Sequence, residues 1–208
     1  MLGALNLDQN YFLKSIYYFK NQDRAIAITF DDAPSASHTE KILSCLEAHQ
    51  IHASFFVIGQ NILGNEDLVK KIHDNGHALG NHSFHHDVKL TFKPSKKIKE
   101  DIEKANSLIE SVIGSSVKYY RPPFGVTNPN IAKIVNSLGL ISVGWTVRSF
   151  DTYFTDADKI AKRMMKKIKP GSILLFHDNQ DVTLEVLNII IPELKNKNYM
   201  FNTIDEIF

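Results

Sequence analysis

Apolar runs of strand length alternate with amphipathic segments of helical spacing along most of the chain. Ala25–Phe30 (AIAITF) lies between the charged pair Asp23-Arg24 and Pro34, and this pattern predicts a short buried strand. Pro94 opens a long segment with apolar residues on one side, which predicts an amphipathic helix. Further strands are predicted at Ala53–Val57, Ala78–Asn81, Lys118–Tyr120, Leu140–Val147, Ser172–Phe176 and Tyr199–Asn202, with helices near His38–His49, Glu66–Asn75, Pro129–Ser137, Asp156–Lys167 and Leu184–Lys195.

This alternation indicates an α/β fold with a parallel sheet, either open or closed into a barrel. At 208 residues, of which 43% are hydrophobic, the chain is expected to form one domain. Polar motifs follow the carboxyl ends of several predicted strands, where the loops of an α/β barrel converge on one active site. These motifs are Asp31-Asp32, His82–His86, Arg121–Gly125, Asp151 and His177-Asp178.

Two adjacent carboxylates, Asp31 and Asp32, end the predicted core strand, and unpaired buried carboxylates are costly. At the end of a strand they can point into a cleft, where a cation would hold one of them. Because successive strand residues point to opposite sides, the backbone after Phe30 must leave extended geometry for both to serve. His82 and His86 are four residues apart, and two histidines with a carboxylate make a three-ligand divalent metal site. The pattern predicts a metal-dependent hydrolase.

Composition narrows the partners and the compartment. Lys and Arg number 24 against 23 Asp and Glu, so the net charge of +1 favours neither nucleic acid nor an anionic membrane. No segment reaches the roughly 18 apolar residues of a membrane helix. The first residues lack the apolar centre and cleavage site of an export signal, which predicts a cytoplasmic protein, although a removed leader would give the same sequence. The single cysteine, Cys45, is expected to be a buried structural thiol.

The motifs TFDD, HSFHH, RPPFG and LLFHD occur in an order that resembles the polysaccharide deacetylase family, the group with the NodB homology domain (carbohydrate esterase family 4). ASFFVIG and GHALGNH add to the likeness. Four ordered motifs are a specific signal, whereas one alone would be weak. The resemblance implies a single-domain distorted (β/α) barrel of about seven parallel strands over residues 25–208. Residues 1–24 would form an N-terminal extension packed on this domain.

By this resemblance, Asp32, His82 and His86 would hold one divalent metal ion. Zinc is the most frequent metal in the family, and cobalt or nickel serves in some members. Asp31 would be the general base that takes a proton from the attacking water. Arg121 would brace Asp31 through a charge-assisted ion pair.

The same resemblance assigns the other side of the cleft. His177 would be the general acid that protonates the leaving amine, and Asp151 would tune its pKa. The backbone N–H of Phe124 would help to bind the oxyanion, since the two preceding prolines lack that donor. Leu175 would line the pocket for the acetyl methyl group, and Trp145 would form part of the cleft wall.

Some positions depart from the family pattern. Ala33 stands where glycine usually follows the paired aspartates, and Phe124 stands where tyrosine is common. The fourth motif usually reads Asp-x-x-Asp-Trp, but here Arg148 replaces its first aspartate and Thr152 its tryptophan. The two changes in the fourth motif alter the wall near the acetyl site, so they bear on substrate identity more than on reaction type.

Each motif also has a purely structural interpretation. Taken alone, the paired aspartates could cap a helix and shape a turn, and the two histidines of HSFHH could be satisfied core residues. His177 could bond a backbone carbonyl, and Arg121 could cap a turn before the two prolines. The joint occurrence of the motifs favours the catalytic and metal-binding interpretation.

The expected function is metal-dependent hydrolysis of N-acetyl groups from amino-sugar residues of a polysaccharide or oligosaccharide, with release of acetate. The partner would be an N-acetylated glycan, either peptidoglycan or a chitin-like polymer, rather than nucleic acid. One alternative is hydrolysis of another acyl bond, such as a sugar formamide or an O-acetyl xylan. Another is a catalytically silent carbohydrate-binding relative. The sequence does not determine the metal or the oligomeric state.

Overall fold

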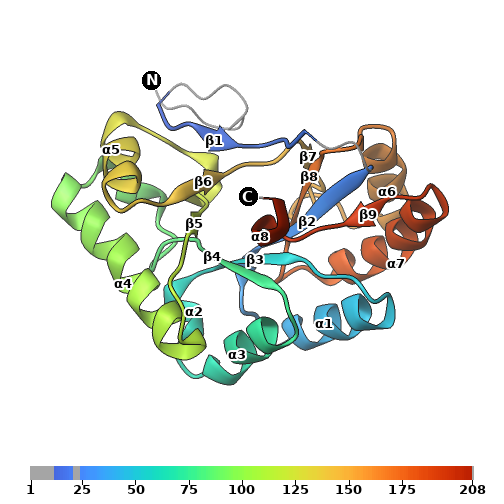
Figure 1. Cartoon of the computed structure of the whole chain (residues 1–208), viewed down its shortest axis with the longest axis horizontal. Helices are drawn as coiled ribbons and strands as arrows, with labels where there is room; N and C mark the ends of the chain where they lie inside the picture. The colour runs from blue at the N-terminus through green and yellow to red at the C-terminus, as the bar shows by residue number, and fades with distance from the viewer. Residues whose placement is uncertain (1–11, 21–23, 208) are drawn as a thin grey trace.

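The computed structural model describes residues 12–20 and 24–207. Within that range, the strands form one parallel sheet in the order β1-β6-β5-β4-β3-β2-β8-β7, with β9 paired to β2. The helices α1 to α7 are arranged around the outside of the curved sheet, whereas the short C-terminal helix α8 lies near its middle (Figure 1). This architecture is the distorted (β/α) barrel that the sequence predicts.

The strands are short and most connections between them carry a helix. The strands are β1 (Ser15–Ile16), β2 (Ala25–Ala33), β3 (Ser54–Val57), β4 (Ala78–Asn81), β5 (Tyr119–Tyr120), β6 (Ile141–Val143), β7 (Val147–Arg148), β8 (Ile173–His177) and β9 (Met200–Phe201). The α-helices are α1 (Thr39–Ala48), α2 (Gly59–Ile62), α3 (Glu66–Asp74), α4 (Ser95–Ile113), α5 (Pro129–Ser137), α6 (Ala157–Met165), α7 (Asp181–Asn196) and α8 (Ile204–Ile207). None of these described helices has the length and apolar character that crossing a bilayer requires.

The prediction of one strand over Leu140–Val147 is wrong, because this segment contributes two strands at different places in the sheet. β6 pairs with β1 and β5, whereas β7 pairs with β8. Between them, the Gly144 N–H donates to the carbonyl of Ile16 and the Thr146 N–H to that of Ile173. The backbone donors on the two sides of Trp145 are thus satisfied by different strands, which divides the apolar run.

The described part of the predicted N-terminal extension joins the sheet. β1 runs parallel to β6, with Ser15 in register with Ser142, and the two hydroxyl oxygens are 2.7 Å apart. Further on, the Phe19 N–H donates to the carbonyl of Gly171. Residues 1–11, 21–23 and 208 lie outside the described residues, and the domain boundaries stay predictions.

β2 is an interior strand of the sheet, with β3 on one side and β8 on the other. Phe30 of β2 stacks on Phe55 with ring centroids 4.8 Å apart and lies 5.9 Å from the ring of Phe176. This aromatic group is part of the main apolar core, against which Cys45 is buried. The Cys45 thiol donates to Asn188 Oδ1, and burial raises its pKa, in agreement with the expected structural thiol.

Candidate active site

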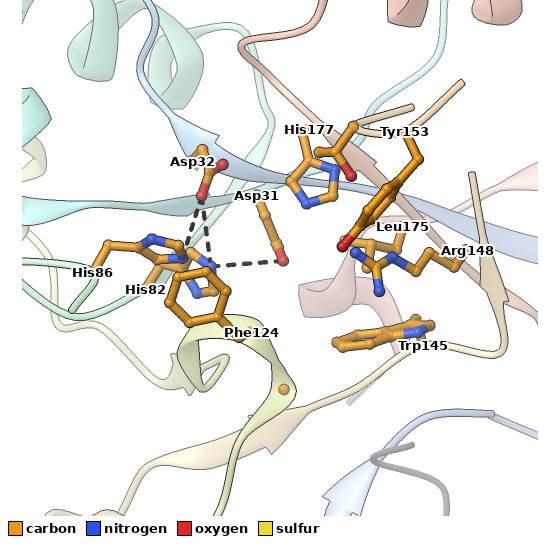
Figure 2. A pocket seen from close by; sticks show the side chains of 12 residues that line it. Asp31, Asp32, His82, His86, Phe124, Trp145, Arg148, Tyr153, Leu175 and His177 are labelled. Atoms are coloured by element: carbon orange, nitrogen blue, oxygen red, sulfur yellow. Dashed lines mark ion pairs between the residues drawn. The ribbon is translucent and has the colours of Figure 1, made fainter. Parts of the chain in front are cut away.

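A bulge at the end of β2 turns both paired carboxylates toward one cleft. β2 pairs Phe30 with Phe55 but Ala33 with Val57, so it carries one more residue than β3 over this stretch. Asp32 is the residue in the left-handed region, with φ of 68°, a conformation that aspartate tolerates better than most residues. The expected departure from extended geometry after Phe30 is therefore confirmed, and Figure 2 shows both carboxylates facing the cleft.

Asp32, His82 and His86 form a group that can hold a metal ion. One ligand atom from each lies within 4.8 Å of the other two. Asp32 Oδ1 is 3.8 Å from His82 Nε2 and 3.5 Å from His86 Nε2 (Figure 2, dashed lines). This oxygen is buried and has no hydrogen-bond partner, an arrangement that is costly unless a cation satisfies it. Two imidazoles and one carboxylate suit a divalent ion that retains open coordination positions.

The protonation of the two histidines suits the same role. His82 Nδ1 lies 2.7 Å from the carbonyl oxygen of Arg121, which can only accept, so Nδ1 carries the proton and Nε2 keeps its lone pair. Burial lowers the pKa of both His82 and His86, which favours their neutral, ligating forms. His86 itself has a positive φ of 49°, and its backbone N–H donates to Ser83 Oγ.

Asp31 is held by the fully buried guanidinium of Arg121. Arg121 Nη1 donates to Asp31 Oδ1 at 2.7 Å and to Thr29 Oγ1 at 2.8 Å. Its Nε and Nη2 donate to the carbonyls of Val143 and Gly144. Burial opposes ionisation of Asp31, but the nearby Arg121 charge and two histidines more than compensate and lower its pKa below the usual value. Asp31 is therefore an ionised carboxylate in the neutral pH range.

His177 is paired with Asp151, and His177 lies on the far side of Asp31 from His82 and His86 (Figure 2). His177 Nδ1 lies 2.7 Å from Asp151 Oδ1, and the His177 backbone N–H donates to Asp151 Oδ2 at 2.8 Å. Burial by itself lowers the pKa of His177, but the hydrogen bond and charge of Asp151 dominate and raise it above its ordinary value. The imidazolium form of His177 therefore persists to higher pH than in an isolated histidine.

The cleft has a volume of about 400 Å³ and brings together eight of the ten predicted site residues. The other two, Arg121 and Asp151, lie behind the lining and contact Asp31 and His177. Phe124, with φ of 58°, is half exposed, and its ring centroid is 4.5 Å from that of His86. The full lining is Asp31, Asp32, His82, His86, Phe124, Gly125, Trp145, Arg148, Thr152, Tyr153, Leu175 and His177.

Three residues that contribute to the site were not predicted from the sequence. Tyr153 lines the cleft directly after the altered fourth motif. Asn179 Nδ2 donates to Asp32 Oδ2 at 3.2 Å, and its place just after LLFHD was a signal for it. Thr183 Oγ1 donates to Asp151 Oδ2 at 2.8 Å from the first turn of α7, where no sequence pattern indicated a role.

These features define a class of protein, an α/β barrel with a group that can hold a metal ion, flanked by a carboxylate and a histidine at the carboxyl ends of its strands. The polysaccharide deacetylase family model matches residues 19–143. The chain belongs to the polysaccharide deacetylase family. It is 33% identical over 186 residues to the peptidoglycan-N-acetylglucosamine deacetylase PgdA of Listeria monocytogenes, covering 89% of this chain and 39% of the relative. The chain therefore spans about two fifths of that relative's length.

Solved structures with the same fold include both a named deacetylase and a protein described as a pseudoenzyme. The Bc1960 peptidoglycan N-acetylglucosamine deacetylase superposes with a TM-score of 0.88 at 30% identity, covering 92% of this chain and 91% of that one. BA3943 of Bacillus anthracis, described as a carbohydrate esterase family 4 pseudoenzyme, superposes with a TM-score of 0.85 at 29% identity. That match covers 92% of this chain and 67% of the pseudoenzyme. The fold alone therefore does not distinguish an active from a silent member, because activity depends on the side chains of the cleft.

Proposed function

We propose that this chain hydrolyses the N-acetyl group of amino-sugar residues in a polysaccharide or oligosaccharide, releasing acetate and a free amine. The single observation that carries the proposal is the arrangement of two charge pairs, Asp31 with Arg121 and His177 with Asp151. Both pairs lie beside the group that can hold a metal ion. Membership of the family supports the reaction class. Two similar proteins are named as peptidoglycan N-acetylglucosamine deacetylases, which supports a glycan substrate of that kind.

Asp32, His82 and His86 would hold the divalent ion. When bound there, the ion would polarise the amide carbonyl and lower the pKa of water. We expect zinc, because two neutral imidazoles and a carboxylate suit it, with cobalt or nickel as substitutes. The unpartnered Asp32 Oδ1 and the free Nε2 of His82 support this ligand set.

Asp31 would act as the general base. Its Oδ1 is taken up by Arg121, so Oδ2 is the oxygen that receives the proton as water attacks the carbonyl carbon. The buried Arg121 keeps the Asp31 carboxylate ionised and fixes its orientation. General-base catalysis of this kind contributes about 10²–10⁴-fold to a rate.

His177 would act as the general acid. Its Nδ1 donates to Asp151, so Nε2 carries the proton that passes to the leaving nitrogen as the C–N bond breaks. Asp151 stabilises the imidazolium, which supports a protonated acid near neutral pH. The water oxygen ends in acetate, and the nitrogen leaves as the free amine.

The rest of the lining would bind the acetamide group. The backbone N–H of Phe124 would donate to the developing oxyanion. Leu175 would contact the acetyl methyl group, and the indole of Trp145 would form the adjacent wall. The presence of all three in the cleft lining supports these roles.

A catalytically silent relative is the second candidate, and the likeness to a named pseudoenzyme is the observation that favours it. Against it, the proposed base and acid are each held by a 2.7 Å contact, and their pKa shifts favour an ionised Asp31 and a protonated His177. A different acyl bond, in a sugar formamide or an O-acetyl xylan, would use the same groups with a different pocket wall.

Acetate release tests the proposal. Purified protein would be assayed on N-acetylglucosamine oligomers and peptidoglycan fragments with zinc, cobalt or a chelator. Acetate that appears with metal and disappears with chelator supports N-deacetylation. Absence of acetate from protein that binds one metal ion tightly would contradict it, and formate or O-acetyl release would then identify the other acyl bond. Absence of both acetate and metal binding would overturn the hydrolase assignment.

A further inference from the structure

Arg148, which ends β7, is a cation of the cleft without an anionic partner in the described chain. It lines the cleft and is partly buried, yet it forms no ion pair with any carboxylate of residues 12–20 and 24–207. Its Nε is buried and makes no hydrogen bond. A buried guanidinium N–H without an acceptor is costly, and a bound anion would remove that cost.

The other charged groups of the cleft are already engaged. Asp31 is paired with Arg121, and His177 with Asp151. Asp32 belongs to the metal-binding group with the two histidines. The charge of Arg148 is therefore the one among the described lining residues that is left for a ligand to balance.

The position of Arg148 suits contact with a part of the substrate beside the acetamide. Arg148 is in register with Leu175, two residues before His177 on β8. Figure 2 shows its guanidinium directed toward the middle of the cleft, on the side of Tyr153 and Trp145 and across from His82 and His86. An acetamide placed between Asp31 and His177 would leave a neighbouring substituent within reach of this guanidinium.

Aromatic rings hold the guanidinium without using its N–H groups. Arg148 Cζ lies 4.9 Å from the ring centroid of Phe150 and 5.8 Å from that of Tyr153. Cation–π contacts of this kind restrain the guanidinium without occupying its N–H donors, which can then bind a carboxylate.

We propose that Arg148 binds a carboxylate of the glycan, so that the cleft prefers amino sugars that bear or adjoin a carboxylate over neutral ones. The inference rests on the proposed function and specifies its substrate class. In the family pattern this position carries an aspartate, so Arg148 reverses the charge at this place in the wall. The carboxylate can belong to an ether substituent of the acetylated sugar or to a neighbouring uronic acid, since both present the same group.

The test measures binding in an Asp31→Asn background, so that turnover does not interfere. The zinc-loaded protein would be titrated in two arms of the experiment. One arm would use oligosaccharides with a lactyl-ether carboxylate on the N-acetylated sugar, and the other would use oligosaccharides with an adjacent uronic acid. Each would be compared with its own methylamide, and the fluorescence of the single tryptophan, Trp145, would report binding. A charge-assisted contact predicts that the free carboxylate binds about 10–100-fold more tightly than its amide in one arm. The arm that shows the preference identifies the source.

Variants distinguish a direct contact between Arg148 and the carboxylate from a general effect of positive charge on binding. Arg148→Gln should reduce the carboxylate preference to less than about threefold, whereas Arg148→Lys should retain part of it, because lysine keeps the charge but not the fork. Lys162→Gln, on the exposed face of α6, is the matched control and should keep the full preference. Circular dichroism of each variant would establish that it is folded.

Equal affinity for carboxylate and amide in both arms would overturn the inference, as would a preference that survives in Arg148→Gln. These outcomes are distinct from failure of the proposed function, which shows as absent acetate release by the unaltered protein. Acetate release from neutral oligomers without any carboxylate preference would remove the inference and leave N-deacetylation standing.

Discussion

Asp31 and His177 are register partners on the adjacent parallel strands β2 and β8. The backbone N–H of Asp178, the next residue, donates to the carbonyl of Asp31 at 2.9 Å. The proposed base and acid are thus fixed relative to each other by the sheet itself rather than by a mobile loop. Functional groups mounted on strands in this way are held more closely to their working geometry than groups on loops.

Replacing the proposed base should separate chemistry from metal binding. Asp31→Asn should reduce kcat by about 10²–10⁴-fold, because the amide cannot accept the proton. Metal content should remain at one ion per chain, since Asp31 is outside the proposed ligand set. Acetate release with elemental analysis of the same sample checks both parts. Near-normal turnover would remove Asp31 from the role of base.

Two histidines of HSFHH, His82 and His85, offer a matched pair of variants for the proposed metal site. His82→Ala should abolish metal uptake, because it removes the Nε2 ligand that His82 directs toward Asp32. His85→Ala is the control: His85 contacts Asp101 and lies outside the group, so the variant should still bind metal. Metal content after dialysis is the measurement. A stoichiometric ion in His82→Ala would refute the ligand set.

The pH profile should depend on Asp151. His177 must be protonated to act as an acid, and Asp151 raises its pKa, so Asp151 extends activity toward alkaline pH. In Asp151→Asn the pKa of His177 should fall, and the alkaline limb of kcat/KM should move to lower pH. Asp181→Asn, which alters a highly exposed carboxylate, should leave the profile unchanged. A variant profile identical to that of the unaltered protein would contradict the assignment of His177 as the acid.

Two glycines with the same backbone angle distinguish strain from packing. Gly125 and Gly139 both have φ of 66°, so alanine at either position should cost roughly 1–2 kcal/mol of stability. At Gly125 the added Cβ would also lie 2.8 Å from the indole of Trp145, whereas nothing lies within 4 Å at Gly139. Gly125→Ala alone should therefore shift the Trp145 fluorescence and weaken glycan binding. Chemical unfolding followed by fluorescence compares the two variants, and identical spectra would contradict the contact.

Local sequence patterns predicted the features that depend on neighbouring residues. The apolar run of β2 and the following aspartates indicated a strand that ends at a cleft, and the need for a bent backbone at Asp32 followed from side-chain alternation alone. The division between β6 and β7 could not be predicted, because it depends on the distant acceptors Ile16 and Ile173. The lack of an ion-pair partner for Arg148 among the described residues could likewise not be predicted, since it depends on where the carboxylates lie in the folded chain.

The pairing of β2 with both β3 and β8 also has a consequence for how the chain folds. β2 lies near the start of the sequence, but Thr29 Oγ1 donates to the carbonyl of Leu174, which is 145 residues further along the chain. Contacts between such distant segments form slowly, because a long loop must close before they can contribute. The three proposed metal ligands are all present in the chain by His86, whereas His177 follows only at the end of β8. During synthesis, the chain would therefore contain the complete proposed ligand set well before it contains the proposed proton donor.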